Sequence, residues 1–162
     1  MHAYFILILW PRHSVTRTLK PEETIDFHLR SAWAKIARLY NAEAAKFGGT
    51  MSIGFILLNI DKEGTPGTKL GPKMGMEPRS LTRTLKSMEA LGLIEKRPCA
   101  TDKRLVRIFL TQKGMEMRET SKNVVINFNQ NLVQTMGNEK VQAVIKTLSE
   151  LNRTLNEKKI SV

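Results

Sequence analysis

The sequence is poor in cysteine and in long apolar runs. Cys99 is the single cysteine among 162 residues, so no internal disulfide can form, and we expect a reducing, cytoplasmic compartment. The most apolar run, residues 4–10, has seven residues, whereas a membrane-spanning helix needs about 20. Neither a basic segment before this run nor a small-residue cleavage site after it indicates a secretory signal. We therefore expect no membrane association, and we treat residues 1–20 as an N-terminal extension without an assigned role.

Acidic residues are also scarce. Asp and Glu total 15 against 26 Lys and Arg, which gives a net charge of +11. This imbalance predicts attraction to polyanions. On charge alone nucleic acid is the first candidate and an anionic membrane surface the second, and we expect nucleic acid rather than a membrane as the partner. Hydrophobic residues make up 41% of the chain and charged residues 25%. Such a composition is typical of a globular protein, and the length suits a single domain.

Residue patterns for catalysis or metal binding are missing. The three histidines, His2, His13 and His28, form no close ligand pair or nucleophile-base pattern with the cysteine. Residues 63–69 resemble a phosphate loop but lack its glycine spacing. A calcium-like pattern that begins at Asn59 has a leucine at its last ligand position, where a glutamate is needed. We expect no enzyme activity, no metal and no cofactor.

The first part of the chain predicts two helices. Pro21 suits a helix start, and apolar residues recur at helical spacing, so we expect one helix of about 27 residues that ends at Gly48. Thr50 is placed to cap a second segment, residues 51–60, whose apolar pattern fits either a buried helix or a buried strand. The cap and the length favour the helix.

Two shorter helices follow, joined by a tight turn at residues 75–77. In residues 65–75, Thr65 suits the cap position and Pro66 the first helical position. Pro72 predicts a late start near Gly71 or a kink, because proline inside a helix costs about 3 kcal/mol. The next helix is expected from Pro78 to Gly92. Apolar residues at helical spacing form its core face, namely Leu81, Leu85, Met88 and Leu91.

The rest of the chain predicts a hairpin and two more helices. Strands are expected at 93–97 and 104–110 around a basic loop, followed by helices capped by Thr111 and Asn138. The fold class is therefore mainly α with a small β-hairpin wing, that is, a winged helix-turn-helix domain plus a helical dimerisation region. The expected regions are 21–64 for the dimerisation helices and their connection, 65–110 for the DNA-binding lobe and 111–162 for the C-terminal dimerisation helices.

Basic residues gather in the predicted lobe. Residues 79 to 107 contain eight basic residues (79, 83, 86, 96, 97, 103, 104 and 107) and three acids (89, 95 and 102). A helix fits the major groove of DNA, where arginines near its start can donate two hydrogen bonds to guanine. Arg79 and Arg83, one turn apart, are the candidates for this contact. Ser80 and Thr82 are candidate hydroxyl contacts and Lys86 a candidate phosphate contact. A solvated basic helix face is the alternative.

The hairpin tip carries a second candidate contact. Lys103 and Arg104 would enter the adjacent minor groove, whose narrow A·T tracts attract arginine. Asp102 would accept hydrogen bonds from Arg104 or from backbone amides of the tip, and so fix the orientation of Arg104. Cys99 lies close to these basic residues, which favour its thiolate, so thiol sensing is one hypothesis and a bystander role is the other.

Residues 65–114 contain three motifs in a fixed order, namely LGPKMGMEPRSLTRTLKSMEALGLIEKRP, then DKR at 102–104 and LTQKG at 110–114. In this combination and spacing they resemble the MarR family of winged-helix transcriptional regulators. The resemblance implies that Arg79, Ser80, Thr82 and Arg83 lie on the recognition helix, and that Asp102 and Arg104 lie on the wing. Gly71 and Pro72 depart from the family pattern, which prefers alanine and a polar residue there. Residues 21–47 also lack the cysteine of the family's peroxide sensors.

The resemblance also implies partners. It implies a homodimer built by the first and last helices, double-stranded DNA with a pseudo-palindromic operator, repression, and release by a small aromatic or phenolic effector or by an oxidant. Such an effector is expected near His28 or Phe55. The long apolar stripes of the first and last helices independently require burial, which favours pairing of two chains. The competing hypothesis is a winged-helix protein-interaction module that docks an acidic partner.

Overall fold

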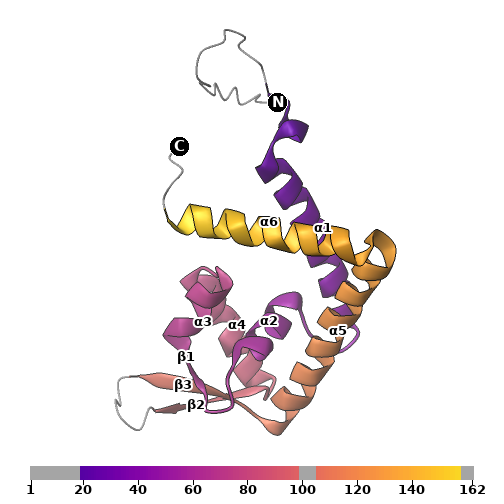
Figure 1. Cartoon of the computed structure of the whole chain (residues 1–162). Coiled ribbons are helices and arrows are strands. Elements are labelled where there is room, and N and C mark those ends of the chain that lie inside the picture. Colours follow the sequence, from indigo (N-terminus) through magenta and orange to yellow (C-terminus); the bar gives the residue numbers. More distant parts are fainter. Residues whose placement is uncertain (1–18, 99–104, 158–162) are drawn as a thin grey trace, which may run out of the picture.

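The computed structural model describes residues 19–98 and 105–157. These residues form a lobe of α2, α3, α4 and a small sheet, with α1 and α6 at the other end and α5 along the side (Figure 1). The elements are η1 (Pro21–Glu23), α1 (Ile25–Ala45), α2 (Met51–Asn59), β1 (Thr65–Pro66), α3 (Gly67–Met74), α4 (Pro78–Ala90), β2 (Ile94–Pro98), β3 (Val106–Leu110), α5 (Gln112–Met136) and α6 (Asn138–Asn156). The predicted class, mainly α with a hairpin wing, is confirmed.

The sheet has three antiparallel strands in the order β1-β3-β2. The predicted hairpin is present, with Ile94 opposite Leu110 at one end and Pro98 opposite Val106 at the other. The third strand, β1, was not predicted, and the assignment of Thr65 as a helix cap is wrong. Thr65 is buried, and its hydroxyl accepts from the backbone N–H of Asp61 (2.9 Å) and donates to the Asp61 carboxylate (3.1 Å).

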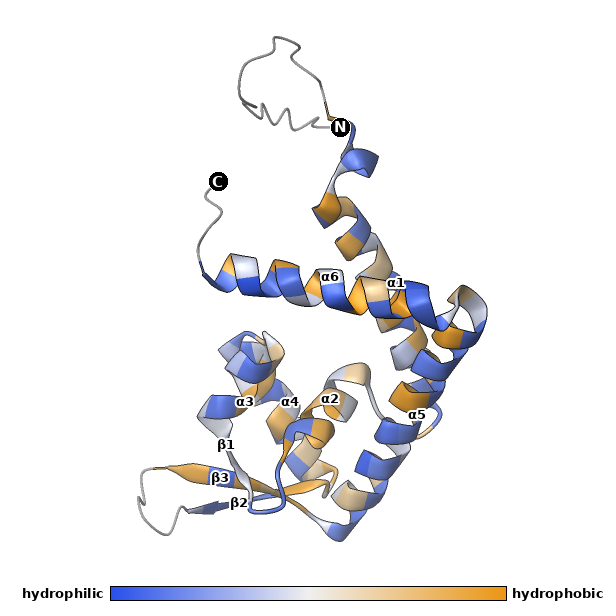
Figure 2. Cartoon of the chain, in the orientation of Figure 1, coloured by the Kyte–Doolittle hydropathy of each residue, from blue (hydrophilic) through white to orange (hydrophobic). Residues whose placement is uncertain are grey.

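The core lies between α2, α3, α4 and the sheet. Its buried residues are Ile53, Ile56, Leu57, Ile60, Leu70, Leu81, Leu85, Met88, Leu93, Ile94 and Ile108. The helix assigned to residues 51–60 is confirmed as α2, and the Thr50 hydroxyl accepts from the N–H of Ile53 at 3.2 Å. Figure 2 shows hydrophobic colouring on α2 and β3 inside the lobe and also along α1. The division of the chain at residues 20, 64 and 110 stays a prediction.

The first helix is shorter than predicted. A 3-10 turn, η1, is separated from α1 by Thr24, whose backbone is extended (φ −104°, ψ 146°). Both the N–H and the hydroxyl of Thr24 donate to the carbonyl of Pro21, at 3.1 and 2.7 Å. This local hydrogen bonding competes with helix continuation, so a single helix from residue 21 is wrong. The α1 helix has 21 residues.

The α3 helix starts at Gly67, so a late start near Gly71 is also wrong, and Pro72 lies inside the helix. Gly71 is buried where α3 meets α4, because a Cβ atom there would lie 3.3 Å from both Leu81 Cδ2 and the carbonyl oxygen of Met76. Gly75 ends α3 in the left-handed conformation (φ 61°), and the N–H of Met76 donates to the carbonyl of Gly71 at 3.0 Å. This helix-ending motif produces the tight turn into α4.

Two smaller expectations also differ from the structure. Leu91 follows the last residue of α4 and is 41% exposed, so it does not belong to the core face. Asn138 is the first residue of α6, and the preceding Gly137 occupies the cap position. Of the helices that the structure describes, none is long and apolar enough to cross a membrane.

Candidate nucleic-acid interface

The α4 helix presents a basic face opposite its buried face. Leu81, Leu85 and Met88 are buried in the lobe, and the helical period then places the candidate contact residues on the exposed side. Arg79, Ser80, Thr82, Arg83 and Lys86 are all exposed. Except for Ser80, these residues line one shallow hollow together with Pro78.

The three cations of this face are unpaired within the described part of the chain. Arg79, Arg83 and Lys86 make no hydrogen bond or ion pair with another described residue. Pro78 begins the helix, and the N-terminal end of a helix carries partial positive charge. The local field is therefore positive and open to solvent, which suits phosphate and the acceptor-rich edge of guanine.

The hydroxyl groups on α4 differ from each other. Thr82 donates its hydroxyl proton to the carbonyl of Pro78 at 2.9 Å, so it can only accept from a partner in this conformation. Ser80 makes no side-chain hydrogen bond with another described residue and keeps both donor and acceptor capacity. The backbone carbonyl of Ser80 accepts from Thr84 at 3.0 Å.

Two other basic residues counted in the sequence, both on β2, are paired with acidic side chains. Lys96 pairs with Glu89 at 2.5 Å. Arg97 pairs with Glu95 and also lies over the Phe109 ring, 4.7 Å from its centroid. The described basic residues of the stretch 79–107 are therefore divided between an open face on α4 and side chains of the sheet that have partners within the chain.

Arg107 connects the wing to the loop before β1. Its Nε and Nη2 atoms donate to the carbonyls of Glu63 (3.2 Å) and Gly64 (2.5 Å). Gly64 has φ +76°, and a Cβ atom there would lie 2.5 Å from the Phe109 ring. The Phe109 ring of β3 therefore packs directly on the backbone of Gly64, where there is no room for a side chain.

The predicted wing-tip residues lie outside the described residues. These are Cys99, Asp102, Lys103 and Arg104.

The start of α5 is hydrogen-bonded to the residues that follow α4. The sequence motifs did not indicate this contact. Thr111 caps α5 by accepting from the N–H of Gly114 (3.0 Å), as predicted, and its hydroxyl also donates to the carbonyl of Gly92 (2.6 Å). Lys113 donates to the carbonyl of Leu91 at 3.0 Å. A Cβ atom at Gly114 would lie 2.0 Å from the carbonyl oxygen of Leu93. The orientation of α4 is thus tied directly to α5.

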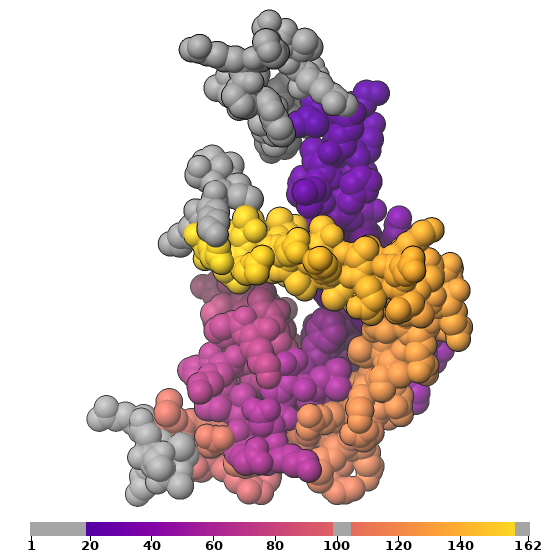
Figure 3. All heavy atoms as spheres, in the orientation of Figure 1, coloured from indigo at the N-terminus to yellow at the C-terminus, as the bar shows by residue number. Residues whose placement is uncertain are grey.

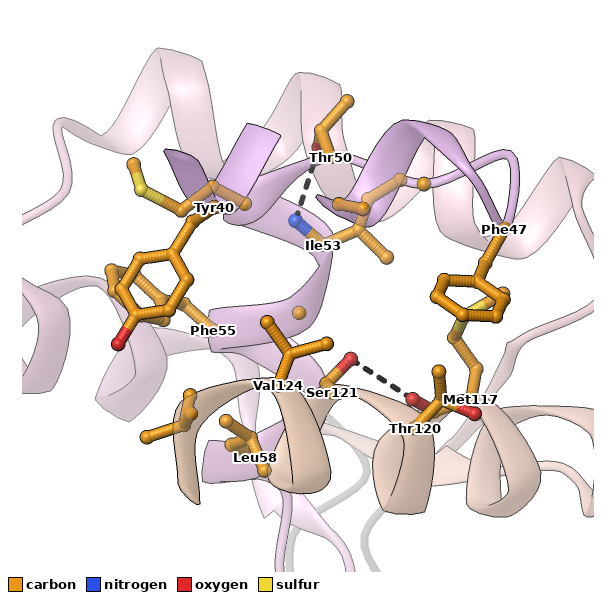
Figure 4. A pocket seen from close by; sticks show the side chains of 15 residues that line it. Tyr40, Phe47, Thr50, Ile53, Phe55, Leu58, Met117, Thr120, Ser121 and Val124 are labelled. Atoms are coloured by element: carbon orange, nitrogen blue, oxygen red, sulfur yellow. Dashed lines mark hydrogen bonds between the residues drawn. The ribbon is translucent and has the colours of Figure 1, made fainter. Parts of the chain in front are cut away.

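A cavity of about 40 Å³ lies between α1, α2 and α5 (Figure 4). Its lining residues are Tyr40, Ala44, Phe47, Gly49, Thr50, Met51, Ile53, Gly54, Phe55, Leu58, Met117, Thr120, Ser121, Val124 and Val125. Phe55 is among them, but His28 is not. The His28 ring is exposed, and its Nε2 atom lies 2.7 Å from the carbonyl oxygen of Glu22. The structure does not bring the two expected effector residues together.

An aromatic group borders this cavity. Phe55 stacks with Trp33 (centroids 6.1 Å apart) and meets Tyr40 edge-on (6.2 Å), and Tyr40 also contacts Phe128 (5.0 Å). Burial raises the pKa of the Tyr40 phenol above its ordinary value. Within residues 19–98 and 105–157, no group of three or more His, Cys, Asp or Glu residues could hold a metal ion.

Comparison with known proteins gives a consistent picture. A sequence model described as the MarR family matches residues 50–106. Solved structures with the same fold include S. aureus MepR in complex with DNA (TM-score 0.74, 18% identity, 82% of this chain and 98% of that one). The transcriptional repressor CouR bound to a 23-mer DNA duplex gives a TM-score of 0.75 at 19% identity, over 86% and 99% of the two chains. A mutant of E. coli MarR complexed with operator DNA gives a TM-score of 0.71 at 22% identity, and the match covers 78% of this chain and 92% of that one.

Proposed function

We propose that this chain is a DNA-binding transcriptional regulator of the MarR family, and that it is a homodimeric repressor that reads a pseudo-palindromic operator with α4. The match of residues 50–106 to the MarR family model and the fold shared with DNA-bound regulators support this proposal. The observation that carries the proposal is the exposed cationic face formed by Arg79, Arg83 and Lys86, which have no partner among residues 19–98 and 105–157. In this proposal α4 enters the major groove.

Each residue of the face has its own part. Arg79 and Arg83 lie one turn apart near the start of α4, where arginine can donate two hydrogen bonds to O6 and N7 of guanine. Lys86 lies further along the helix and neutralises a backbone phosphate. Ser80 and Thr82 supply short polar contacts, with Thr82 acting as an acceptor. On the wing, Lys103 and Arg104 reach the minor groove, and Asp102 orients Arg104.

Exposed apolar side chains support pairing of two chains. On α1 and α6 these are Ile25, Phe27, Leu29, Trp33, Leu39, Val144, Ile145 and Leu155. The α6 helix packs chiefly on α5, and Figure 3 shows one side of α6 open to solvent above the lobe. Its exposed apolar side chains are therefore available to pack on a second copy of the chain. A two-fold dimer would place two copies of α4 about 34 Å apart, which matches one turn of DNA.

The cavity between α1, α2 and α5 supports control by a small effector. It touches α1, which carries proposed dimer contacts, α5, on which α6 packs, and α2, which belongs to the core of the lobe. An effector that binds more tightly to the arrangement of these helices that does not fit DNA raises the population of that arrangement, and DNA is released.

Selection of bound duplexes from a random pool tests the proposal. We expect a two-fold-related consensus, and we expect the logarithm of the binding constant to fall linearly with the logarithm of salt concentration because phosphates are neutralised. Sedimentation of the complex should give two chains per duplex. Failure to bind any duplex at about 100 mM salt would overturn the proposal and favour a module that docks an acidic protein partner.

A further inference from the structure

The cavity between α1, α2 and α5 has a lining without charge. None of its lining side chains is Lys, Arg, His, Asp or Glu. A carboxylate or phenolate buried in such a place would lose its hydration without gaining a counter-charge, which is strongly unfavourable. An uncharged apolar molecule loses little by entering and gains from leaving water.

The hydroxyl groups around the cavity offer an anion little compensation. Thr120 and Ser121 donate their protons to carbonyls of their own helix, those of Glu116 (3.2 Å) and Met117 (2.9 Å). Thr50 is exposed, and its oxygen accepts from the N–H of Ile53. Tyr40 has no side-chain hydrogen bond to another described residue, and burial raises the pKa of its phenol, which keeps the group a neutral donor.

The size of the cavity limits the ligand further. A volume of about 40 Å³ is well below the roughly 150 Å³ of a dry apolar cavity that binds benzene. Entry of a ligand therefore requires the lining to move. Met51 and Met117 belong to the lining, and methionine side chains adapt to new shapes at low cost. A ligand that widens the space pushes α2 and α5 apart and thus acts on the contact between the lobe and the proposed dimer helices.

We propose that this cavity takes a small, uncharged, predominantly apolar molecule with at most one neutral polar group, and that it excludes aromatic and aliphatic carboxylates of the same size. The geometry provides one neutral phenol, that of Tyr40, as a hydrogen-bond partner inside an otherwise apolar lining. This inference rests on the proposed function, because it names the chemical class of effector for the site assigned there.

Matched pairs of compounds test the charge requirement. Benzyl alcohol against benzoate, and butan-1-ol against butanoate, differ mainly in charge at neutral pH. Trp33 stacks on Phe55, which lines the cavity, so its fluorescence reports occupancy when the chain's other tryptophan is removed by Trp10→Phe. We expect saturable binding of the alcohols and an affinity at least tenfold weaker for the acids. Equal or tighter binding of the acids, or no binding of either alcohol, would overturn the proposal.

Substitutions on one helix localise the binding. Ala44 lines the cavity, whereas the neighbouring Ala45 is exposed and does not. Ala44→Leu should abolish alcohol binding, and Ala45→Leu should leave it unchanged. Val124→Phe on α5 fills the same space from the opposite side and covers the case in which Ala44→Leu does not fold. Alcohol binding that survives both filling substitutions in folded protein would place the ligand elsewhere.

Operator binding without any ligand keeps the two proposals separable. If the ligand-free protein binds its operator and the alcohols bind without releasing the DNA, then the preference of the cavity for uncharged ligands is upheld, and the proposed release of DNA by the ligand is wrong. If the alcohols bind the cavity but no operator is found, the proposed DNA-binding function fails and the ligand class still holds.

Discussion

The ammonium group of Lys113 donates a hydrogen bond of 3.0 Å to the backbone carbonyl of Leu91, the residue that follows α4. Carbonyl groups at the end of a helix lack internal partners and carry partial negative charge, so a cation there is stabilising. Because Lys113 lies in the first turn of α5, the same contact links α4 to the helix that leads away from the lobe. Lys113 is therefore a positioning residue for α4.

Lys113→Met should lower the free energy of unfolding by about 0.3 to 1 kcal/mol and weaken operator binding without changing its salt dependence. A lysine that contacts phosphate would instead reduce the slope of the salt dependence by about 1. Urea unfolding and salt titration of operator binding distinguish the two roles. Lys122→Met on the same helix, where Lys122 pairs with Glu119 at 3.3 Å, is the control. A reduced slope for Lys113→Met alone would show that Lys113 contacts DNA directly.

Arg79→Ala and Arg83→Ala should each weaken binding to the selected operator by about 1 to 3 kcal/mol while changing binding to random DNA far less. The reason is that two hydrogen bonds to a guanine are lost together. Titration of both duplexes by fluorescence anisotropy measures the difference. Lys96→Ala serves as a matched loss of charge, because Lys96 is paired with Glu89. Equal losses on operator and random DNA would contradict base reading by these arginines.

The parts of the fold that were predictable are those set by nearby residues. The α2, α4 and α5 helices follow from caps and apolar spacing within a few positions, and the basic face of α4 follows from its helical period. By contrast, β1 has two residues and is a strand only because Thr65 pairs with Ile108, far along the chain. Thr24 interrupts the first helix through hydrogen bonds that compete with the helix itself.

The candidate site shows the same division between local and distant causes. Which residues of α4 face solvent could be predicted, but which cations remain free could not. Arg107 is tied to the carbonyl of Glu63, 44 residues earlier in the chain, and Lys96 reaches back to Glu89 on α4. The cavity beside Phe55 is formed by three helices, and no pattern within one of them specifies its volume or lining.

Gly114→Ala should destabilise the fold by about 1 to 3 kcal/mol, because a Cβ atom there would lie 2.0 Å from the carbonyl oxygen of Leu93 and the backbone must shift to accept it. Thermal and urea unfolding measure the loss. The control is Gly67→Ala, where the nearest atom, Ile108 Cδ1, would lie 3.4 Å from the new Cβ. Similar stabilities for the two variants would mean that the first turn of α5 does not pack closely against the backbone of Leu93, between α4 and β2.

Tyr40→Phe should remove part of the loss of stability at alkaline pH. Burial raises the pKa of Tyr40 in the folded state above its ordinary value of 10.0, so the folded chain holds this proton more tightly than the unfolded chain. The stabilising contribution is complete below pH 10.0 and falls as the pH rises above that value. Urea unfolding of both proteins between about pH 9 and pH 11 checks this. Parallel pH dependences would indicate that the phenol is as accessible folded as unfolded.

Ile145→Asp on α6 should convert the proposed dimer to monomer. Ile145 is 49% exposed and lies beside Val144 on the face of α6 that also carries the buried Val141. A carboxylate placed at the centre of an apolar interface must be desolvated without a partner, which is enough to separate subunits. Ala143→Asp, on the opposite side of the same helix, adds the same charge and should leave the dimer intact. Sedimentation equilibrium at micromolar concentration distinguishes the two variants, and operator affinity should fall only for Ile145→Asp, because a single α4 makes half of the contacts. A wild-type chain that sediments as a monomer, or equal behaviour of the two variants, would contradict an interface on this face of α6.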